Sequence, residues 1–299
     1  MKDKLKAVFS FLLLFYSVSA FSQSENKALV VPLVDNLKGL ANVITVSSSG
    51  GDFTDIQSAI DSIGDGEPTF NDPFLILIGP GSYTITNTIV VPDHVSIMGT
   101  GPDVTQISGS VKHSTDSETN MGLVSANGLS GISNLSITNF PDTGNGEFGF
   151  TIHNFEHINN VVAQVIHFTI DSTTGTLKTI LTDSALSTSI TNSTVKAIFS
   201  SAATGVESIG RLVIENSDIE AFGATNNTGV VGPNANSNFR ILLMTNSQAS
   251  GDTASIVINN ADTRVVNTGV EASSVDDNVG GTTNCLNVYN IDTLSPESC

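Results

Sequence analysis

A small set of charged residues has the types and spacing needed for acid–base or metal chemistry. Asp218 and Glu220 stand two residues apart, so on a strand both project from the same face. Lys196 and Glu271 occupy the position of Glu220 in an earlier and a later copy of a sequence repeat described below. Carboxylates are the ligands that calcium prefers, and a lysine beside them could remove a proton. We therefore predict calcium candidates at Asp218, Glu220 and Glu271, and catalytic candidates at Lys196, Asp218 and Glu220.

A motif centred on asparagine returns six times and sets the register of these residues. An apolar residue stands two before each asparagine, another stands three after it, and a polar residue stands four after it. The asparagines follow one another at intervals of 26, 32, 24, 30 and 21 residues. A period in this range with a fixed internal register predicts a solenoid. The six positions are Asn134, Asn160, Asn192, Asn216, Asn246 and Asn267.

Short runs rich in Val, Ile and Thr, with little helical periodicity beyond Ile63, predict an all-β fold. The register favours a single-stranded, right-handed parallel β-helix whose coils stack about 4.8 Å apart. Asparagine tolerates the left-handed backbone of a sharp corner, and its side chains could bond to one another inside the coil. The alternative is a β-sandwich in which these asparagines mark ordinary turns. Strands are expected at 43–46, 74–78, 85–91 and 95–98, and Phe74, Phe199 and Phe222 are expected in the core.

The N-terminal region divides into three predicted parts. Residues 1–20 have a basic start, an apolar centre and a small-residue site ending at Ala20, the pattern of a secretory signal peptide. Residues 21–42 are an N-terminal arm, and residues 43–299 are the β-helix domain. A capping box that begins at Thr54 opens a helix over 56–63, which should shield the end of the solenoid. The mature protein is therefore expected outside the cytoplasm: secreted, periplasmic or at the cell surface.

Charge and cysteine content limit the partners. The formal charge is −18, and it becomes −20 without residues 1–20, which hold 3 of the 11 Lys and Arg and 1 of the 29 Asp and Glu. This sign argues against nucleic acid and anionic membranes, and no later segment is apolar enough for membrane insertion. Cys285 and Cys299 could form a disulfide in an oxidising compartment. His153, His157 and His167 are too far apart on strands to share zinc without a bend.

Residues 43–60, 76–83 and 95–109 resemble the pectin-lyase-like parallel β-helix superfamily, and most of all the start of pectinesterases. The resemblance implies three parallel sheets with loops projecting from the corners. The segments that carry catalysis in pectinesterases (Gln-Asp-Thr, Asp-Phe-Ile-Phe-Gly and Gly-Arg-Pro-Trp) are absent, and the chain has no Trp. Asp276-Asp277 lacks the companion motifs of polygalacturonases. The resemblance therefore implies the scaffold without its residue-level chemistry.

These observations leave three functions open. The first is a non-catalytic, exported protein that presents a surface to polysaccharides or cell-surface glycans, with no cofactor. The second is a divergent calcium-dependent polysaccharide lyase or other pectin-active enzyme, in which Arg211 and Arg240 would lie on strands adjoining the acidic column. The acidic column is the set of outward positions of Asp218, Glu220 and Glu271. In the first function these residues form a solvated polar ladder in which Lys196 pairs with Glu220. The third is an adhesin or tailspike-like module that forms oligomers.

Overall fold

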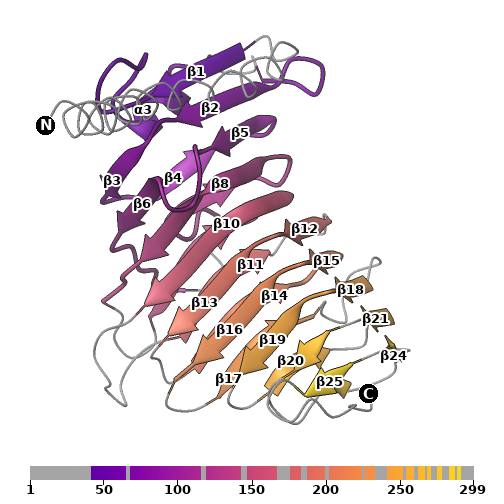
Figure 1. The fold of residues 1–299 in the computed structure, drawn as a ribbon. Coiled ribbons are helices and arrows are strands. Elements are labelled where there is room, and N and C mark those ends of the chain that lie inside the picture. Colours follow the sequence, from indigo (N-terminus) through magenta and orange to yellow (C-terminus); the bar gives the residue numbers. More distant parts are fainter. Residues whose placement is uncertain are drawn as a thin grey trace, which may run out of the picture. The chain divides into compact units, whose positions relative to one another are not determined.

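The computed structural model describes a stack of β-coils that begins at Asn42, and the predicted all-β parallel β-helix is confirmed (Figure 1). The described residues are 42–64, 68–115, 119–142, 147–166, 176–182, 187–198, 202–223, 226–232, 241–251, 254–258, 262–266, 268–270, 275–277, 283–286 and 288–290. The predicted signal peptide and the arm up to residue 41 lie outside them.

The strands form three parallel ladders, each with one strand from successive coils. The first ladder consists of β1 (Asn42–Val46), β2 (Phe74–Ile78), β5 (Val95–Met98), β12 (Thr188–Thr191), β15 (Leu212–Glu215), β18 (Ile241–Thr245), β21 (Asp262–Val266) and β24 (Thr283–Leu286), together with the first halves of β8 (Gly131–Asn139) and β10 (His157–Ile166). The second ladder consists of β3 (Gly81–Ile85), β6 (Thr105–Gly109), the second halves of β8 and β10, β13 (Thr194–Ile198), β16 (Asp218–Phe222), β19 (Gln248–Gly251), β22 (Gly269–Val270) and β25 (Tyr289–Asn290).

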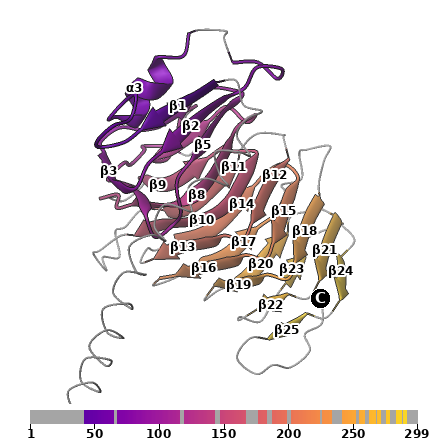
Figure 2. The ribbon, with the colours of Figure 1, turned by 45° about the horizontal axis from the view of Figure 1, so that its top comes forward.

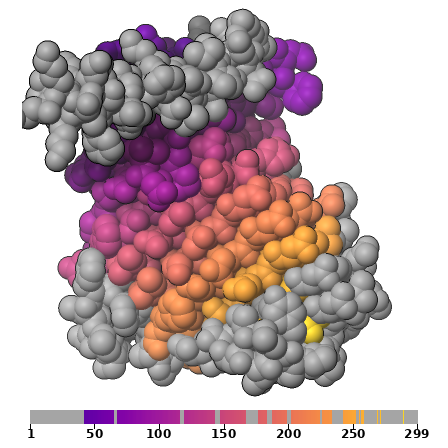
Figure 3. Space-filling view, in the orientation of Figure 1, coloured from indigo at the N-terminus to yellow at the C-terminus, as the bar shows by residue number. Residues whose placement is uncertain are grey.

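The third ladder is a separate eight-stranded sheet. It consists of β4 (Ile89–Val91), β7 (Val124–Ala126), β9 (Phe148–His153), β11 (Thr176–Thr182), β14 (Ala202–Ser208), β17 (Asn227–Val231), β20 (Ala254–Ile258) and β23 (Val275–Asp277). The view in Figure 2 shows the strands of successive coils lying side by side in the order of the sequence. The coils also form successive coloured bands, from indigo to orange, in the space-filling view (Figure 3).

The core fills the space between the ladders with apolar side chains of matching register. Ile132 and Ile214 come from the first ladder, Ile137 and Ile219 from the second, and Ile180 from the third, and all are buried. Burial of each such side chain contributes roughly 1.5–3 kcal/mol relative to exposure. Residues two before and three after the corner asparagine therefore face inward in every coil whose side chains are described.

Two details of the N-terminal coils differ from the sequence predictions. The run 85–91 is two strands, because β3 ends at Ile85 and β4 starts at Ile89. Helix α3 spans Ile56–Asp61, and Asp55 rather than Thr54 is its N-cap, with its carboxylate accepting from the backbone N–H of Ser58 at 2.7 Å.

The inner face of α3 joins the apolar core. Ile56, Ala59 and Ile60 are buried in it, and the side-chain oxygen of Gln57 accepts a hydrogen bond from the backbone N–H of Val90 at 2.9 Å. Gln57 thereby ties the helix to β4 instead of closing a capping box. The role of α3 as a shield for the end of the stack stays a prediction.

Candidate functional site

The corner between the first and second ladders is built from a left-handed asparagine followed by a buried residue. The φ angle of this asparagine lies between 48° and 54° in all five described coils that carry the motif, at Asn134, Asn160, Asn192, Asn216 and Asn246. Asparagine adopts this conformation at less cost than most side chains, because its short amide can bond locally. Asn267 lies outside the described residues.

The asparagine side chains lie on the outer side of this corner, not inside the coil as expected. Asn160, Asn192, Asn216 and Asn246 are exposed. The amide nitrogen of Asn160 donates to the side-chain oxygen of Asn134 at 2.8 Å, and that of Asn216 donates to Asn192 at 3.4 Å. The amide of Asn192 instead bonds Asn159 at 3.1 Å, so the row of amides is interrupted there.

A buried serine row on the inner side fixes the backbone beneath these amides. The hydroxyl oxygens of Ser193, Ser217 and Ser247 accept from the backbone N–H groups of Val161, Ser193 and Ser217, at 3.2, 3.2 and 3.1 Å. Each hydroxyl also donates, at 2.8 Å, to the carbonyl two residues earlier in its own coil. Both bonds satisfy groups that would otherwise be buried without a partner. The sequence signal was available, since Asn-Ser occurs at each of these three corners.

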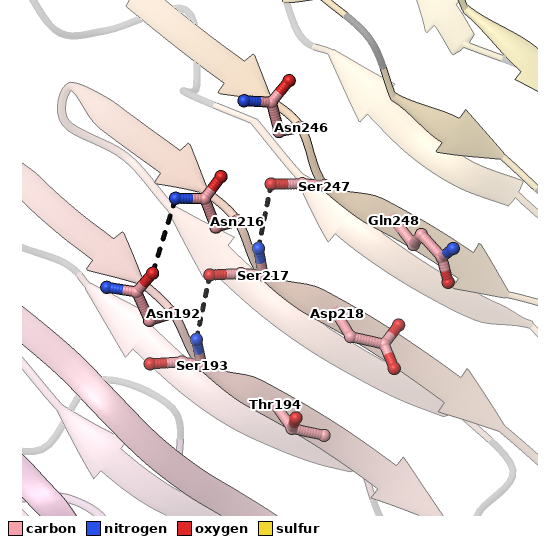
Figure 4. Close-up of a pocket in the computed structure, with 9 residues that line it drawn as sticks. All are labelled: Asn192, Ser193, Thr194, Asn216, Ser217, Asp218, Asn246, Ser247 and Gln248. Carbon is pink, nitrogen blue, oxygen red and sulfur yellow. Dashed lines mark hydrogen bonds between the residues drawn. The ribbon is translucent and has the colours of Figure 1, made fainter.

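A polar groove of about 610 Å³ runs along this corner over three coils. Figure 4 shows its side chains as three parallel rows, one of amides, one of serines and one from the first residues of β13, β16 and β19. All nine lining residues carry an amide, a hydroxyl or a carboxyl group: Asn192, Ser193, Thr194, Asn216, Ser217, Asp218, Asn246, Ser247 and Gln248. The groove therefore offers hydrogen bonds repeated at the spacing of the coils, about 4.8 Å.

The outer face of β16 continues from the groove through alternate residues. Asp218, Glu220 and Phe222 share this face, while Ile219 and Ala221 point inward and are fully buried. Phe222 is 36% exposed, so its predicted place in the core is wrong: the strand period puts Ala221 there instead. Ile198 of β13 lies in register beside Phe222, and it too is only partly buried.

Three charged groups meet on this face. The ammonium of Lys196 lies 2.6 Å from the Glu220 carboxylate, as the register between β13 and β16 requires. Partial burial is the main cause that raises the pKa of Asp218 from its ordinary value of 3.8 to about 6. The charge of Glu220 and a hydrogen bond with it raise this pKa further, whereas Lys196 opposes the shift. The face thus holds two carboxyl groups and one cation.

The structure brings three of the predicted site residues together and leaves others apart. Lys196, Asp218 and Glu220 share one face, and Glu271 lies outside the described residues. Arg211 precedes β15 of the first ladder, across the corner from Asp218, so it does not adjoin the acidic column as expected. Arg240 and Cys299 also lie outside the described residues, so the disulfide between Cys285 and Cys299 stays a prediction.

Calcium binding by Asp218, Glu220 and Glu271 stays a prediction, because Glu271 lies outside the described residues. The carboxylate of Glu220 is already engaged by the Lys196 ammonium, and calcium requires six to eight oxygen ligands. Within the ranges that the structure describes, no group of three or more His, Cys, Asp and Glu side chains is placed to hold a metal. The catalytic role of Lys196 stays a prediction; in this structure its ammonium pairs with Glu220.

The histidines belong to different ladders. His153 is buried at the end of β9, with its Nδ1 2.9 Å from the hydroxyl of Ser125, whereas His157 is exposed at the start of β10. His167 lies outside the described residues. Within the described part of the chain, no helix is long and apolar enough to cross a membrane.

Comparison with known proteins supports the architecture. No protein-family model matches the sequence, and no characterised protein matches it in a sequence search. Solved structures do match. The Escherichia coli protein YbhC has 15% identity and a TM-score of 0.57, with 84% of this chain and 85% of that chain covered. The pectin methylesterase from Aspergillus niger has 14% identity and a TM-score of 0.55, with 85% and 87% covered.

The pectin methylesterase from Yersinia enterocolitica gives a similar result. It has 12% identity and a TM-score of 0.52, with 83% of this chain and 94% of that chain covered. Sequence identities this low show that the fold is shared, but they do not show that the activity is shared. The predicted scaffold is confirmed, because the chain shares its parallel β-helix fold with these pectin methylesterase structures.

Proposed function

We propose that this protein binds a carbohydrate chain along the polar groove and the outer face of β16. The observation that carries the proposal is the threefold repeat, along the groove, of an exposed corner amide and the polar side chain that begins the next strand, with the serine row holding the backbone beneath them. A ligand that matches it must present hydrogen-bonding groups at a regular spacing, which a polymer of sugars does and a single small molecule does not. Several of the structural neighbours, as pectin methylesterases, are carbohydrate-active proteins.

The outer face of β16 adds the second property that sugar binding needs. It runs about 13 Å along the strand from Asp218 to Phe222. Phe222 and Ile198 form a partly exposed apolar surface against which the C–H face of a sugar ring can pack. Glu220 on the same face can accept hydrogen bonds from hydroxyl groups. The polar groove and the apolar surface of Phe222 and Ile198 together form one extended candidate binding surface.

The test compares binding of neutral oligosaccharides to the wild type and to a variant with Asn192, Asn216 and Asn246 replaced by Gly. Glycine keeps the positive φ of the corner and removes only the amides. Isothermal titration should show an affinity lowered at least about tenfold, from several lost hydrogen bonds of roughly 0.5–1.5 kcal/mol each. Asn226→Gly, at another positive-φ position outside the groove, is the matched control. Equal affinity in the wild type and the triple variant would exclude the groove as the binding site.

A second candidate function is acid–base cleavage of the bound chain. The raised pKa of Asp218 beside Glu220 favours it, because a carboxyl group that titrates near 6 can donate a proton at neutral pH. Purified protein would be incubated with a panel of polysaccharides while new reducing ends and unsaturated products are followed. Turnover that is lost in Asp218→Asn would support catalysis, and silence across the panel would leave binding alone.

Export of the protein is part of the same proposal. Residues 1–20 have the composition of a signal peptide, and a carbohydrate chain is met outside the cytoplasm. Mass spectrometry of the protein recovered from its native cells should give a mature chain that starts after Ala20. A full-length mass with an intact Met1 would contradict export by cleavage.

A further inference from the structure

The groove has an unbalanced charge. Asp218 is the only ionisable residue among the nine that line it, and none of the nine is a Lys or Arg. The nearest described cation, Lys196, lies 2.6 Å from Glu220 on the same face. When both carboxyl groups are ionised, two negative charges therefore share one ammonium, and the surplus charge lies at the groove.

The strands around Asp218 do not supply a second cation. Its partners in register are Thr194 on β13 and Gln248 on β19, and neither titrates. Glu220 lies two residues on along β16, and Glu215 lies across the corner on the first ladder. Among the residues that the structure describes, the charged groups on these strands and across the corner are therefore Glu220, Glu215 and the already engaged Lys196.

A ligand cation would relieve this imbalance. Asp218 is half-buried and lies beside another carboxylate, and both conditions make its ionised form costly. An ammonium on the ligand would stabilise the ionised form of Asp218. A uronate would instead place a third negative charge beside Asp218 and Glu220, on a protein whose formal charge is already −18.

We propose that the groove selects carbohydrate chains that carry free amino groups, with the Asp218 carboxylate as the partner of a ligand ammonium. This inference rests on the proposed carbohydrate binding and names the class of sugar. The exposed amides of Asn192, Asn216 and Asn246 would bind the hydroxyl groups of successive residues, and Asp218 would distinguish an amino sugar from its acylated or neutral counterparts. Glu220 and Lys196 stay paired beside the ligand.

The experiment uses two probes of the same length: a glucosamine oligomer, whose amino groups can be protonated, and the N-acetylated oligomer, which carries neutral amides in their place. Titration calorimetry at pH 6.5 and low salt should show the wild type binding the free-amine form about five- to tenfold more tightly, the size expected of one partly exposed ion pair. The preference should shrink as pH falls below about 6, where Asp218 becomes neutral, and it should shrink with added salt.

Two variants separate the Asp218 contact from general attraction to an acidic protein. Asp218→Asn keeps the shape and the hydrogen-bonding capacity of the side chain and should abolish the preference while both oligomers still bind. Asp103→Asn removes the same formal charge at an exposed carboxyl outside the groove and should leave the preference unchanged. A preference that survives in Asp218→Asn would overturn the inference.

The remaining outcomes distinguish this inference from the proposed function. Equal binding of both oligomers to the wild type, with loss in the triple Asn→Gly variant, would overturn the amino-sugar preference and support groove binding. Binding of neither oligomer would overturn the preference, and binding unaffected by the triple variant would overturn both proposals.

Discussion

The second and third ladders each carry a lysine–glutamate ion pair, but the two pairs have different surroundings. On the third ladder, Lys178 of β11 lies 3.1 Å from Glu207 of β14, and Lys178 is only 8% exposed. On the second ladder, Lys196 and Glu220 lie 2.6 Å apart on a face that also presents Asp218 and leads into the groove.

The aromatic residues follow the same division. Phe150 of β9 is fully buried in an apolar cluster with Met121 and Leu181, separate from the main core, whereas Phe222 of β16 is partly exposed. Lys178 and Phe150 on the third ladder are therefore covered more fully than Lys196 and Phe222 on the second, whereas the two glutamates are exposed to a similar extent, 28% for Glu207 and 20% for Glu220. A fully buried side chain such as that of Phe150 can only stabilise the fold, whereas a partly exposed one such as that of Phe222 can also contact a ligand.

The two phenylalanines give the largest expected contrast. Phe150→Ala should lower the free energy of unfolding by about 3–5 kcal/mol, because it leaves a cavity in a fully buried cluster. Phe222→Ala should lower it by about 1–2 kcal/mol, because this residue is 36% exposed and its removal leaves no closed cavity. Urea unfolding monitored by circular dichroism measures both, and Phe70→Ala, at a position 83% exposed, is the control. Equal losses at Phe150 and Phe222 would remove the distinction between the ladders.

The two lysines give the next contrast. Lys178→Ala should lower the free energy of unfolding by about 2 kcal/mol, because it removes a lysine that is itself largely buried and its ion pair with Glu207. Lys196→Ala should lower it by about 1 kcal/mol or less, as is usual for pairs that water reaches. The more exposed Lys112–Glu147 pair supplies the control variant Lys112→Ala. A larger loss at Lys196 than at Lys178 would reverse the comparison.

Removing the surplus carboxylate should stabilise the protein at neutral pH. The pKa of Asp218 is higher in the folded state than its ordinary value of 3.8, so the unfolded state releases this proton first as pH rises. Below about pH 4 both states hold the proton; stability is then lost between about pH 4 and 6 and stays reduced above that. Asp218→Asn should therefore gain about 1 kcal/mol at pH 7, after allowance for solvent screening, and nothing at pH 3.5. Urea midpoints at the two pH values test it, and a gain of the same size at both would argue against titration of Asp218.

The smallest effect is a shift in one pKa. In Glu220→Gln the neighbouring negative charge is gone, so the pKa of Asp218 should fall below about 6. It should stay above 3.8 because burial, the largest cause of the shift, remains. Carbon-13 NMR titration of the Asp218 carboxyl measures the change. An unchanged pKa would show that Glu220 does not act on Asp218.

Much of the fold could be read from periodicity. The asparagine register predicted which residues face inward, because the side-chain period of a strand is two and a corner resets it at the same residue in each coil. Ile132, Ile214, Ile137 and Ile219 are buried as that register requires. The apolar run around Phe222 predicts burial, but the period of the strand places Phe222 on the outer face of β16, and there the period decides.

The candidate site was only partly predictable. Asp218, Glu220 and Lys196 were expected on one outward face from their positions in the repeat, and they lie there. The groove was not expected, because its residues are ordinary polar side chains that form a surface only when three coils bring their corners together. The Asn-Ser pairs at these three corners are the sequence signal of the serine row, which the register of the asparagines alone does not predict.

The sequence by itself determined the β-helix, its corners and the inward and outward columns, because these depend on local backbone preference and on a short repeat. The tertiary structure decided three further properties: the amides on the outside of the corner, the buried hydroxyls beneath them and the raised pKa of Asp218. Each of these depends on what the neighbouring coil places a few ångströms away, and residues that lie 24 to 32 positions apart in the chain meet there only after the coils stack.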